Sequence, residues 1–282
     1  MHPEISILLA NFNNGHFFKE AFDSLLHQTF KNWEAIIIDD CSTDNSVEVI
    51  QNLIKGDDRF LFFKNEVNKG YQETIVRAVS LSRAEIFGRL DPDDTLSPDA
   101  IEISMNAHRK NPEVGLVYSD LAVRGKEMEF WWKHSSKQID HLDEKYYNLN
   151  GEISPFATFK KSVYNRTSGL DPWIRRAEDK DIYMKMCEAA PVIYIPRMLY
   201  NYRQVEGSLS TNSNELKAIF WHWVALTRMM DRRKINLEDI FVEKFVDRQR
   251  VNDSVREREQ QIKWLKNNWF GRLLGKTWGK NF

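Results

Sequence analysis

Short apolar runs alternate along the chain with segments in which apolar residues recur every three or four positions. The runs predict strands buried on both faces, at residues 5–10, 33–38, 60–63, 84–88, 114–118 and 192–195. Helical spacing between them predicts helices, including one over residues 71–82, one from Pro98 and one after Asp179. Because strands joined through helices run parallel, the pattern predicts an α/β fold with a mostly parallel sheet.

Polar residues gather directly after four of the predicted strands, at residues 11–14, 39–44, 68–70 and 91–94. The carboxyl ends of parallel strands share one edge of a sheet, and open α/β folds bind ligands at that edge. A single turn of this kind carries little information. Four of them in register predict a ligand-binding rim.

The last of these turns, Arg89-Leu90-Asp91-Pro92-Asp93-Asp94, carries three carboxylates within four residues. Such groups repel one another unless a cation lies between them, and carboxylate oxygens suit a hard divalent ion such as Mg²⁺ or Mn²⁺. The proline restricts the backbone and aims the carboxylates. The alternative is a solvated acidic turn in front of the helix from Pro98.

A second acidic cluster, Glu178, Asp179 and Asp181, falls in the first turn of a predicted helix. The partial positive charge of a helix N-terminus favours carboxylates, so capping explains part of the pattern. Three acidic residues in one turn exceed what a cap needs, which indicates a functional role as well.

Residues 121–150 show no clear period and place Trp131, Trp132, Tyr146 and Tyr147 among many charges. This segment is longer than an ordinary connection between elements. Exposed aromatic rings beside polar groups suit stacking on the face of a sugar. Packing of the same rings against the far side of the sheet fits the sequence equally well.

The chain has 282 residues, of which 42% are hydrophobic and 29% charged, as is typical of a soluble protein with a substantial core. Its net charge of −1 gives no general attraction for nucleic acid, so no nucleic-acid partner is expected. Two isolated cysteines, no signal-peptide pattern and no apolar run of about 20 residues predict a cytosolic protein. Neither Gly-x-Gly-x-x-Gly nor a P-loop motif occurs, so a bound diphosphate would need a cation for neutralisation.

Several segments, taken in order, resemble the family-2 inverting nucleotide-sugar glycosyltransferases of the GT-A fold, over residues 3–210. The matching segments are Ile5 to Asn13, Ile38 to Asp44, Asn68-Lys69-Gly70, Leu90 to Asp94, Glu178-Asp179 and Tyr202-Arg203. Their order and spacing together are specific to this family. The resemblance implies a Rossmann-like sheet flanked by helices, a nucleotide-sugar donor, and a glycan or lipid-linked acceptor.

The resemblance also implies roles for single residues on the donor side. Ala10 stands where the family often has proline, and Lys69 lies in the Asn-x-Gly segment; both are assigned to donor binding. Phe12 stands where the family places an aromatic ring against the nucleotide base. Asp40 stands where a carboxylate accepts a hydrogen bond from the base, usually uracil.

On the reacting side, Asp91 and Asp93 match the Asp-x-Asp pair that holds a metal on the donor diphosphate, so Asp91 also belongs to the donor site. The implied cofactor is Mg²⁺ or Mn²⁺, which neutralises charge on the leaving diphosphate. Asp179 matches the catalytic base that accepts the proton of the acceptor hydroxyl. Glu178 lies beside it on the acceptor side.

The chain departs from the family pattern at further positions. Ile75 and Val76 stand where many members carry Arg-Asn. Val205 stands where a histidine often helps to hold the metal, so that ligand position passes to water or the metal binds more weakly. Neither departure removes the Asp pair or the base.

Residues 1–210 are assigned to the catalytic domain and residues 211–282 to a C-terminal helical extension. A helix is predicted over residues 212–233, and the apolar spacing from Leu237 to Trp269 suits a homodimeric coiled coil or a helix folded back on the catalytic domain. The stretch from Lys263 to Lys280 combines basic residues with three tryptophans and no acids. This composition suits peripheral contact with the inner face of an anionic membrane; a packed or disordered tail is the alternative.

The leading hypothesis is an inverting, metal-dependent glycosyltransferase that takes a UDP-sugar and acts in surface polysaccharide synthesis. A non-catalytic nucleotide-sugar-binding or scaffolding protein of the same fold is the alternative. A nucleotidyltransferase would need a glycine-rich basic loop after the first strand, which residues 11–15 do not provide.

Overall fold

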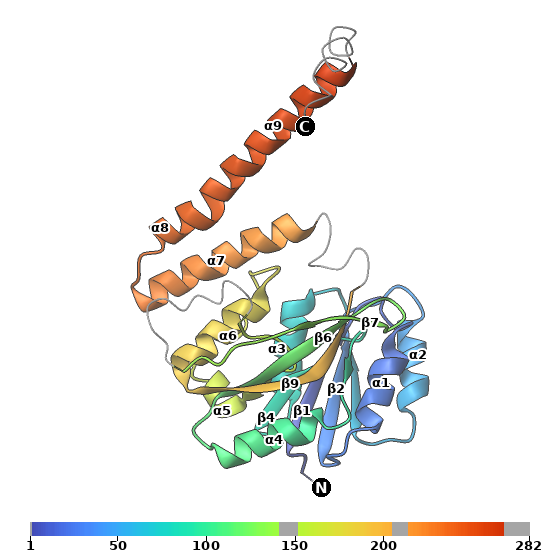
Figure 1. Ribbon diagram of the computed structural model, residues 1–282. Helices are drawn as coiled ribbons and strands as arrows, with labels where there is room; N and C mark the ends of the chain where they lie inside the picture. The colour runs from blue at the N-terminus through green and yellow to red at the C-terminus, as the bar shows by residue number, and fades with distance from the viewer. Residues whose placement is uncertain (1, 141–151, 205–213, 268–282) are drawn as a thin grey trace. The chain divides into compact units, whose positions relative to one another are not determined.

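The computed structural model describes residues 2–140, 152–204 and 214–267 (Figure 1). Contacts within the chain divide it into two compact units, residues 1–229 and residues 230–282. The domain boundary predicted at residue 210 lies outside the described residues.

Within the described residues, the first unit is built on a nine-stranded sheet in which four neighbouring strands are parallel. In chain order these strands are β1 (Ile5–Asn11), β2 (Trp33–Asp39), β3 (Phe60–Lys64) and β4 (Ile86–Arg89). They lie in the order β3-β2-β1-β4. The sequence predicts all four from their apolar runs; β1 and β2 are buried along their whole length, whereas β3, at the edge of the sheet, is only partly buried.

The other half of the sheet mixes directions. Its strands are β5 (Thr95–Leu96), β6 (Leu116–Arg124), β7 (Phe130–His134), β8 (Thr158–Lys160) and β9 (Val192–Arg203). The order continues as β4-β8-β6-β9-β5, and β7 also pairs with β6. The β6–β9 pair is parallel, as predicted, whereas β5, β7 and β8 are antiparallel strands that the sequence pattern does not reveal.

Strand β9 unites two segments that the sequence keeps apart, residues 192–195 and 199–203. Pro196 stands between them. The register against β6 shifts at this point, because Ser119 pairs with Ile195 but the next residue pairs with Met198. A bulge of this kind accommodates a proline, which has no N–H to give to the ladder.

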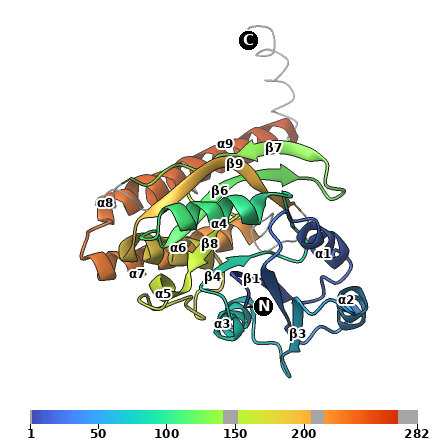
Figure 2. The ribbon, with the colours of Figure 1, turned by 90° about the horizontal axis from the view of Figure 1, so that it is seen from below.

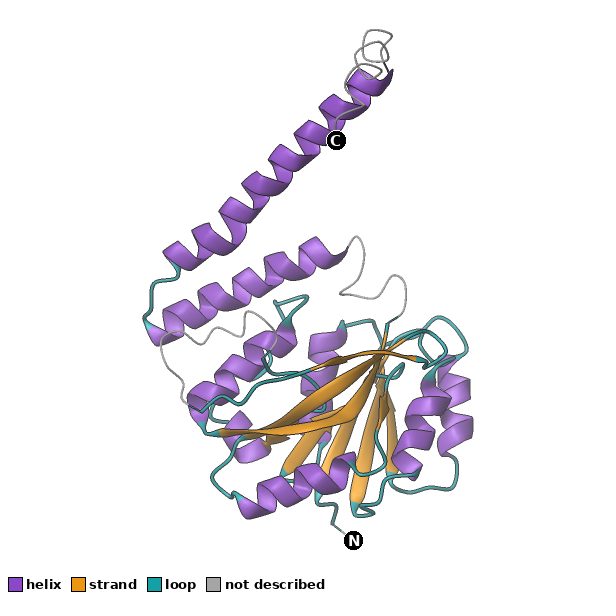
Figure 3. Cartoon of the chain, in the orientation of Figure 1, coloured by secondary structure: helices purple, strands orange, loops and turns teal. Residues whose placement is uncertain are grey.

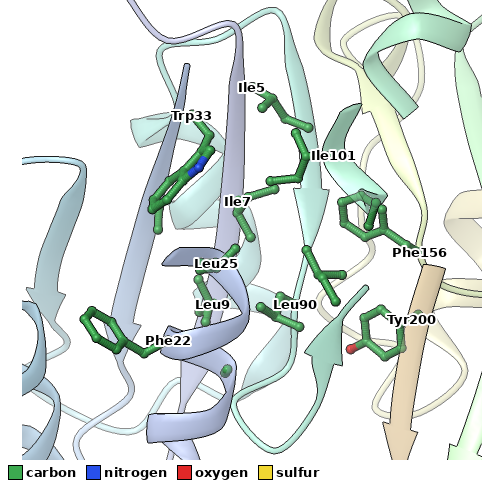
Figure 4. Close-up of a cluster of buried hydrophobic side chains, with 14 of the residues drawn as sticks. Ile5, Ile7, Leu9, Phe22, Leu25, Trp33, Leu90, Ile101, Phe156 and Tyr200 are labelled. Atoms are coloured by element: carbon green, nitrogen blue, oxygen red, sulfur yellow. The ribbon is translucent and has the colours of Figure 1, made fainter. Parts of the chain in front are cut away.

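Helices cover both faces of the sheet (Figures 2 and 3). One face packs against α1 (Phe18–Leu26), α2 (Ser46–Ile54) and α4 (Ala100–Lys110). The other face packs against α3 (Tyr71–Leu81), α5 (Lys161–Tyr164) and α6 (Glu178–Ala189). Strand β1 shows the alternation that this requires, because Ile7 and Leu9 enter the first core (Figure 4) and Leu8 the second.

The C-terminal part is helical, as predicted. Helix α7 (Glu215–Arg233) is followed by α8 (Glu238–Phe241), a π-helical turn (Val242–Val246) and α9 (Asp247–Asn267). In the part of the chain that the structure describes, none of the helices has the length and apolar character needed to cross a membrane. Most of the predicted basic, aromatic tail, residues 268–282, lies outside the described residues.

Candidate active site

The carboxylate of Asp40, directly after β2, organises the turn that leads into α3. It is 3% exposed and accepts hydrogen bonds from the side chain of Asn65 at 2.7 Å, the backbone N–H of Lys69 at 2.9 Å and that of Gly70 at 2.8 Å. Gly70 has a φ of 87°, a conformation that favours glycine. The amide of Lys69 is therefore fixed on Asp40, while its side chain is exposed.

The ends of β1 and β2 are tied together by polar side chains. Asn11 donates a hydrogen bond to Asp39 at 2.9 Å, and the side-chain oxygen of Asn13 accepts one from the backbone of Thr43 at 2.8 Å. Ala10 is buried in β1, as a strand residue. Phe12, by contrast, is 47% exposed, so its ring lies at the surface of this edge of the sheet.

At the end of β4, successive side chains point to opposite faces of the sheet. Leu90 is fully buried and lies in the same core as Tyr200 (Figure 4). Asp91 contacts α3 instead, because the hydroxyl of Tyr71 donates a hydrogen bond to its carboxylate at 2.8 Å. The guanidinium of Arg89 lies over the ring of the same tyrosine, 5.6 Å from its centroid. The acidic turn is therefore anchored on one side by the core and on the other by α3.

The three carboxylates of this turn have different environments. Asp94 is buried and accepts hydrogen bonds from the hydroxyl of Tyr200 and the backbone N–H of Arg203, both at 2.7 Å. Burial and, to a smaller extent, the negative charge of Asp91 together raise the pKa of Asp93 to about 6. Asp94 is thus held by contacts within the chain, and Asp91 and Asp93 remain the candidates for holding a cation.

The N-terminus of α6 brings the second acidic cluster to the same place. Helix α6 begins at Glu178 after Ala177, whose φ of 58° is left-handed. The carboxylate of Glu178 lies 3.6 Å from the guanidinium of Arg89. Asp181 is buried and forms an ion pair with Lys185 at 2.5 Å. One of the three acids is thereby explained by packing, and Glu178 and Asp179 remain candidates for the site.

The electrostatics around Glu178 are unfavourable for its charge. Burial, and then the negative charge of Asp179, raise the pKa of Glu178 to about 7 against the opposing effect of Arg89. Asp179 accepts a hydrogen bond from the backbone N–H of Lys180 at 2.8 Å. Among the described residues, the hydroxyl of Tyr183 and one guanidinium nitrogen of Arg89 are buried without a hydrogen-bond partner. The Arg89 nitrogen is the one that lies 3.6 Å from the Glu178 carboxylate.

A continuous path of contacts joins the two regions. Asp40 binds the backbone of Gly70, and the next residue, Tyr71, binds Asp91 and lies under the guanidinium that faces Glu178. The structure therefore links three of the sequence-predicted site residues, Asp40, Asp91 and Glu178, through one path of contacts. Sequence reasoning missed Tyr71 and assigned no role to Arg89. The only signal for Arg89 is a charged residue at the end of an apolar run.

The chemistry of the Asp91–Asp93 pair fits a hard divalent ion. Two carboxylates close enough to raise the pKa of one of them present oxygen ligands with an excess of negative charge. Mg²⁺ commonly binds through one or two carboxylates together with substrate phosphates. Within the described residues, no group of three or more His, Cys, Asp or Glu side chains forms a metal site, so phosphate and water would complete the coordination. Position 205, the family's histidine position, lies outside those residues.

Comparison with known proteins adds to this geometry. The sequence model of the family described as "Glycosyl transferase family 2" matches residues 6–167. The chain is 28% identical over 205 residues to chondroitin synthase of Escherichia coli, an alignment that covers 71% of this chain and 29% of that protein. The chain spans less than a third of the chondroitin and hyaluronan synthases that it matches.

Two solved structures share the fold. Residues 1–349 of Staphylococcus aureus TarS in complex with UDP-GlcNAc give a TM-score of 0.60 at 16% identity, covering 80% of this chain and 66% of that chain. The mannosyltransferase PcManGT of Pyrobaculum calidifontis in complex with GDP-Man and Mn²⁺ gives 0.61 at 15% identity, covering 81% and 65%. These similarities confirm the predicted GT-A type of fold.

Proposed function

The chain belongs to glycosyl transferase family 2, and from this premise we propose that it transfers a sugar from a UDP-sugar to a glycan or lipid-linked acceptor, with inversion. The predicted family is thereby confirmed, while donor, acceptor and stereochemistry are part of the proposal. Two facts support the donor class: TarS is seen with UDP-GlcNAc, and a matched relative is a chondroitin synthase. The proposed setting is the synthesis of a surface polysaccharide.

One observation carries the proposal. The hydroxyl of Tyr71 binds Asp91, and the guanidinium over the tyrosine ring lies 3.6 Å from Glu178. A pair of carboxylates suited to a metal and a pair suited to acid–base chemistry are therefore separated by two side chains. Sugar transfer from a nucleotide needs both groups at one reaction centre.

The proposed nucleotide site lies beside Asp40. A carboxylate offers about four acceptor positions, and the turn uses three of them on Asp40. The fourth suits an N–H of the base, while the exposed ring of Phe12 suits stacking. Ala10 would form the floor of the site, and the exposed side chain of Lys69 would face the donor.

In the proposed reaction, the acceptor hydroxyl attacks C1 of the donor sugar while the bond from C1 to the diphosphate oxygen breaks. Attack from the face opposite the leaving group inverts C1, and Asp179 accepts the hydroxyl proton. Asp91 and Asp93 would hold Mg²⁺ or Mn²⁺, whose Lewis-acid character neutralises charge on the leaving diphosphate. Glu178, held by Arg89, would bind the acceptor.

The test is turnover of nucleotide sugars with and without Mn²⁺. A thermal-shift screen of UDP- and GDP-sugars selects the donor, and release of the nucleoside diphosphate then reports hydrolysis or transfer. We expect a UDP-sugar to raise the melting temperature and to be turned over only with a divalent ion. If a nucleotide sugar binds without turnover under every condition, the protein is the non-catalytic alternative. If none binds, the proposed function is wrong.

For the C-terminal extension, the proposal includes two partners: an anionic membrane and a second copy of the chain. We propose that residues 263–282 bring the protein to the inner face of an anionic membrane, because the stretch is basic and Trp264 is 66% exposed. A homodimer through α9 is supported by Val255 and Ile262, which are seven residues apart and about half exposed.

A further inference from the structure

The β6–β7 hairpin, residues 116–134, occupies a distinctive place in the sheet. One side of β6 pairs with β9 along its whole length. The other side is shared, because β8 pairs with Leu116 and Val117 and β7 pairs from Leu121 to Arg124. Strand β8 also pairs with β4, antiparallel to both of its neighbours, so β6 and β4 run in the same direction. Strand β7 therefore follows β8 towards the sheet edge at which β4 ends.

This placement sets β7 beside the space beyond Asp91. Strand β7 pairs with β6 along one side, and no strand among the described residues pairs with its other side. Its free side belongs to the same side of β6 as β4, whose carboxyl end carries the Asp91–Asp93 turn. The hairpin therefore flanks the candidate active site and does not belong to the opposite edge of the sheet.

The turn of the hairpin is bonded to the acidic turn through one side chain. Arg203 donates hydrogen bonds to the backbone carbonyl of Asp93, at 2.7 Å, and to the backbone carbonyl of Lys126 in the hairpin turn. Its own backbone N–H binds Asp94. Arg203 therefore bridges the hairpin turn and the proposed metal ligand Asp93, which fixes the position of one relative to the other.

Strand β7 exposes a row of aromatic rings, Phe130, Trp131 and Trp132. Their exposed fractions are 51%, 45% and 50%, and the two tryptophan rings stack with centroids 5.7 Å apart. About half of each tryptophan side chain is therefore open to solvent, whereas Tyr146 and Tyr147, which the sequence groups with them, lie outside the described residues. A contiguous exposed aromatic patch beside a site marks a surface that binds something.

The polar groups around these rings already have partners within the chain. The indole N–H of Trp131 donates to Glu129 at 3.1 Å, Lys133 pairs with Asp120 at 2.6 Å, and the guanidinium of Arg124 lies 5.4 Å from the centroid of the Phe130 ring. These contacts hold the strand and satisfy its charges. What the strand offers to a ligand is the flat, uncharged faces of rings.

We propose that the β6–β7 hairpin is the acceptor platform and that the acceptor is a carbohydrate chain whose sugar rings stack on Trp131 and Trp132. The C–H face of a pyranose is apolar and flat, and it matches an aromatic face that is fixed by its neighbours. An anionic lipid phosphate would instead select cations, and here Lys133 is already paired with Asp120. The inference rests on the proposed function, because an acceptor exists only if a sugar is transferred.

The platform is tested by measuring how the protein binds to an array of immobilised bacterial oligosaccharides. The variants are Trp131→Ala/Trp132→Ala, the corresponding double Phe variant, and Phe220→Ala as a control for loss of an exposed aromatic ring in α7. We expect the double Ala variant to lose about tenfold or more in affinity for the glycans that wild type binds. The double Phe variant should recover part of that loss, and the control should bind normally. In the double Ala variant, KM for the glycan should rise more than kcat falls.

Three results would overturn the platform. They are a wild type that binds no glycan on the array, a double Ala variant that binds normally, and a variant whose only change is in self-association or in binding to anionic vesicles. The donor-dependent thermal shift of each variant reports folding and donor binding separately. A normal donor shift with unchanged glycan binding defeats the platform alone, whereas tryptophan-dependent glycan binding without any nucleotide-sugar binding defeats only the proposed function.

Discussion

Two groups of carboxylates lie along the same edge of the sheet, and their surroundings differ. Asp40 has its two oxygens bound by three N–H donors at 2.7 to 2.9 Å, two of them from the backbone. Asp91 receives one hydroxyl from Tyr71, and Asp93 beside it has a pKa raised to about 6 by burial and by that neighbour's charge. The chain itself supplies three donors to the first site and leaves the second with excess negative charge.

The comparison distinguishes a carboxylate that stabilises the fold from a carboxylate pair that is suited to a reaction. A carboxylate bound by backbone amides fixes a turn in advance, and the turn at residues 65–70 leads directly into α3. A carboxylate pair with too few donors stabilises the fold less than neutral groups would. Retaining such a pair makes sense when a cation and a substrate supply the missing partners. Each of the following changes weakens one side of the comparison.

The largest effect is expected from Asp179→Asn. The amide keeps the shape of the side chain but cannot take a proton, so turnover should fall by about 10²- to 10⁴-fold. Donor affinity should remain, because Asp179 is assigned to the acceptor hydroxyl. Turnover per folded molecule and donor affinity are measured on the same samples. A near-normal rate in folded Asp179→Asn protein would contradict the base assignment and leave helix capping as the explanation of this residue.

Asp40→Asn should mainly affect stability. An amide retains one acceptor oxygen and turns an NH₂ group towards a backbone N–H such as that of Gly70, so at least one charged hydrogen bond is lost. We expect the free energy of unfolding to fall by about 2–3 kcal/mol, measured by urea denaturation. Asp93→Asn serves as the matched control, because removing a repelled charge should leave stability unchanged or slightly higher. Equal losses in both variants would erase the distinction between the two sites.

A smaller effect concerns pH. The pKa of Glu178 in the folded protein is about 7, above its ordinary value of 4.5, so the folded state holds a proton that the unfolded state releases. Stability should therefore fall as pH rises from 6 to 8, by about 1 kcal/mol in the absence of metal. Glu178→Gln should lose this part of the slope. An unchanged slope in that variant would mean that Glu178 does not carry the proton.

The smallest effect on catalysis is expected from deleting residues 263–282. If the basic, aromatic tail contacts anionic lipid, the shortened protein should no longer sediment with anionic liposomes. Turnover on a soluble acceptor should stay at the wild-type rate, since the deletion leaves every proposed site residue in place. Equal liposome binding by both proteins would exclude the tail as the membrane contact.

The first half of the fold follows from sequence because its strands are apolar runs separated by helices. The apolar run of residues 33–38 is an example, since it predicts β2 to within one residue. Strand β8 shows the limit, because three residues are too few to display a period. Strand β9 shows another, because Pro196 ends a strand in the sequence pattern and is accommodated by a bulge in the sheet.

The site divides in the same way. Asp91, Asp93 and Asp179 are recognised by motif, because each lies at a fixed place after a strand or at the start of a helix. The contacts of Tyr71 and Arg89 depend on how α3 and α6 pack across the end of β4, and no local pattern encodes that packing. The same holds for the different environments of the three carboxylates in the acidic turn, because Asp94 is bound by strand β9 more than 100 residues later.

Calorimetric titration of UDP tests most directly whether the Asp91–Asp93 pair is held ready for a cation. Wild type and Asp93→Asn are compared in Mn²⁺ and in EDTA, with Asp40→Asn as a variant of the other site. The account predicts that Mn²⁺ strengthens UDP binding to wild type by at least about tenfold and has no such effect on folded Asp93→Asn protein. The Asp40 variant should bind UDP more weakly but keep the metal dependence. Full metal dependence in Asp93→Asn would contradict the account.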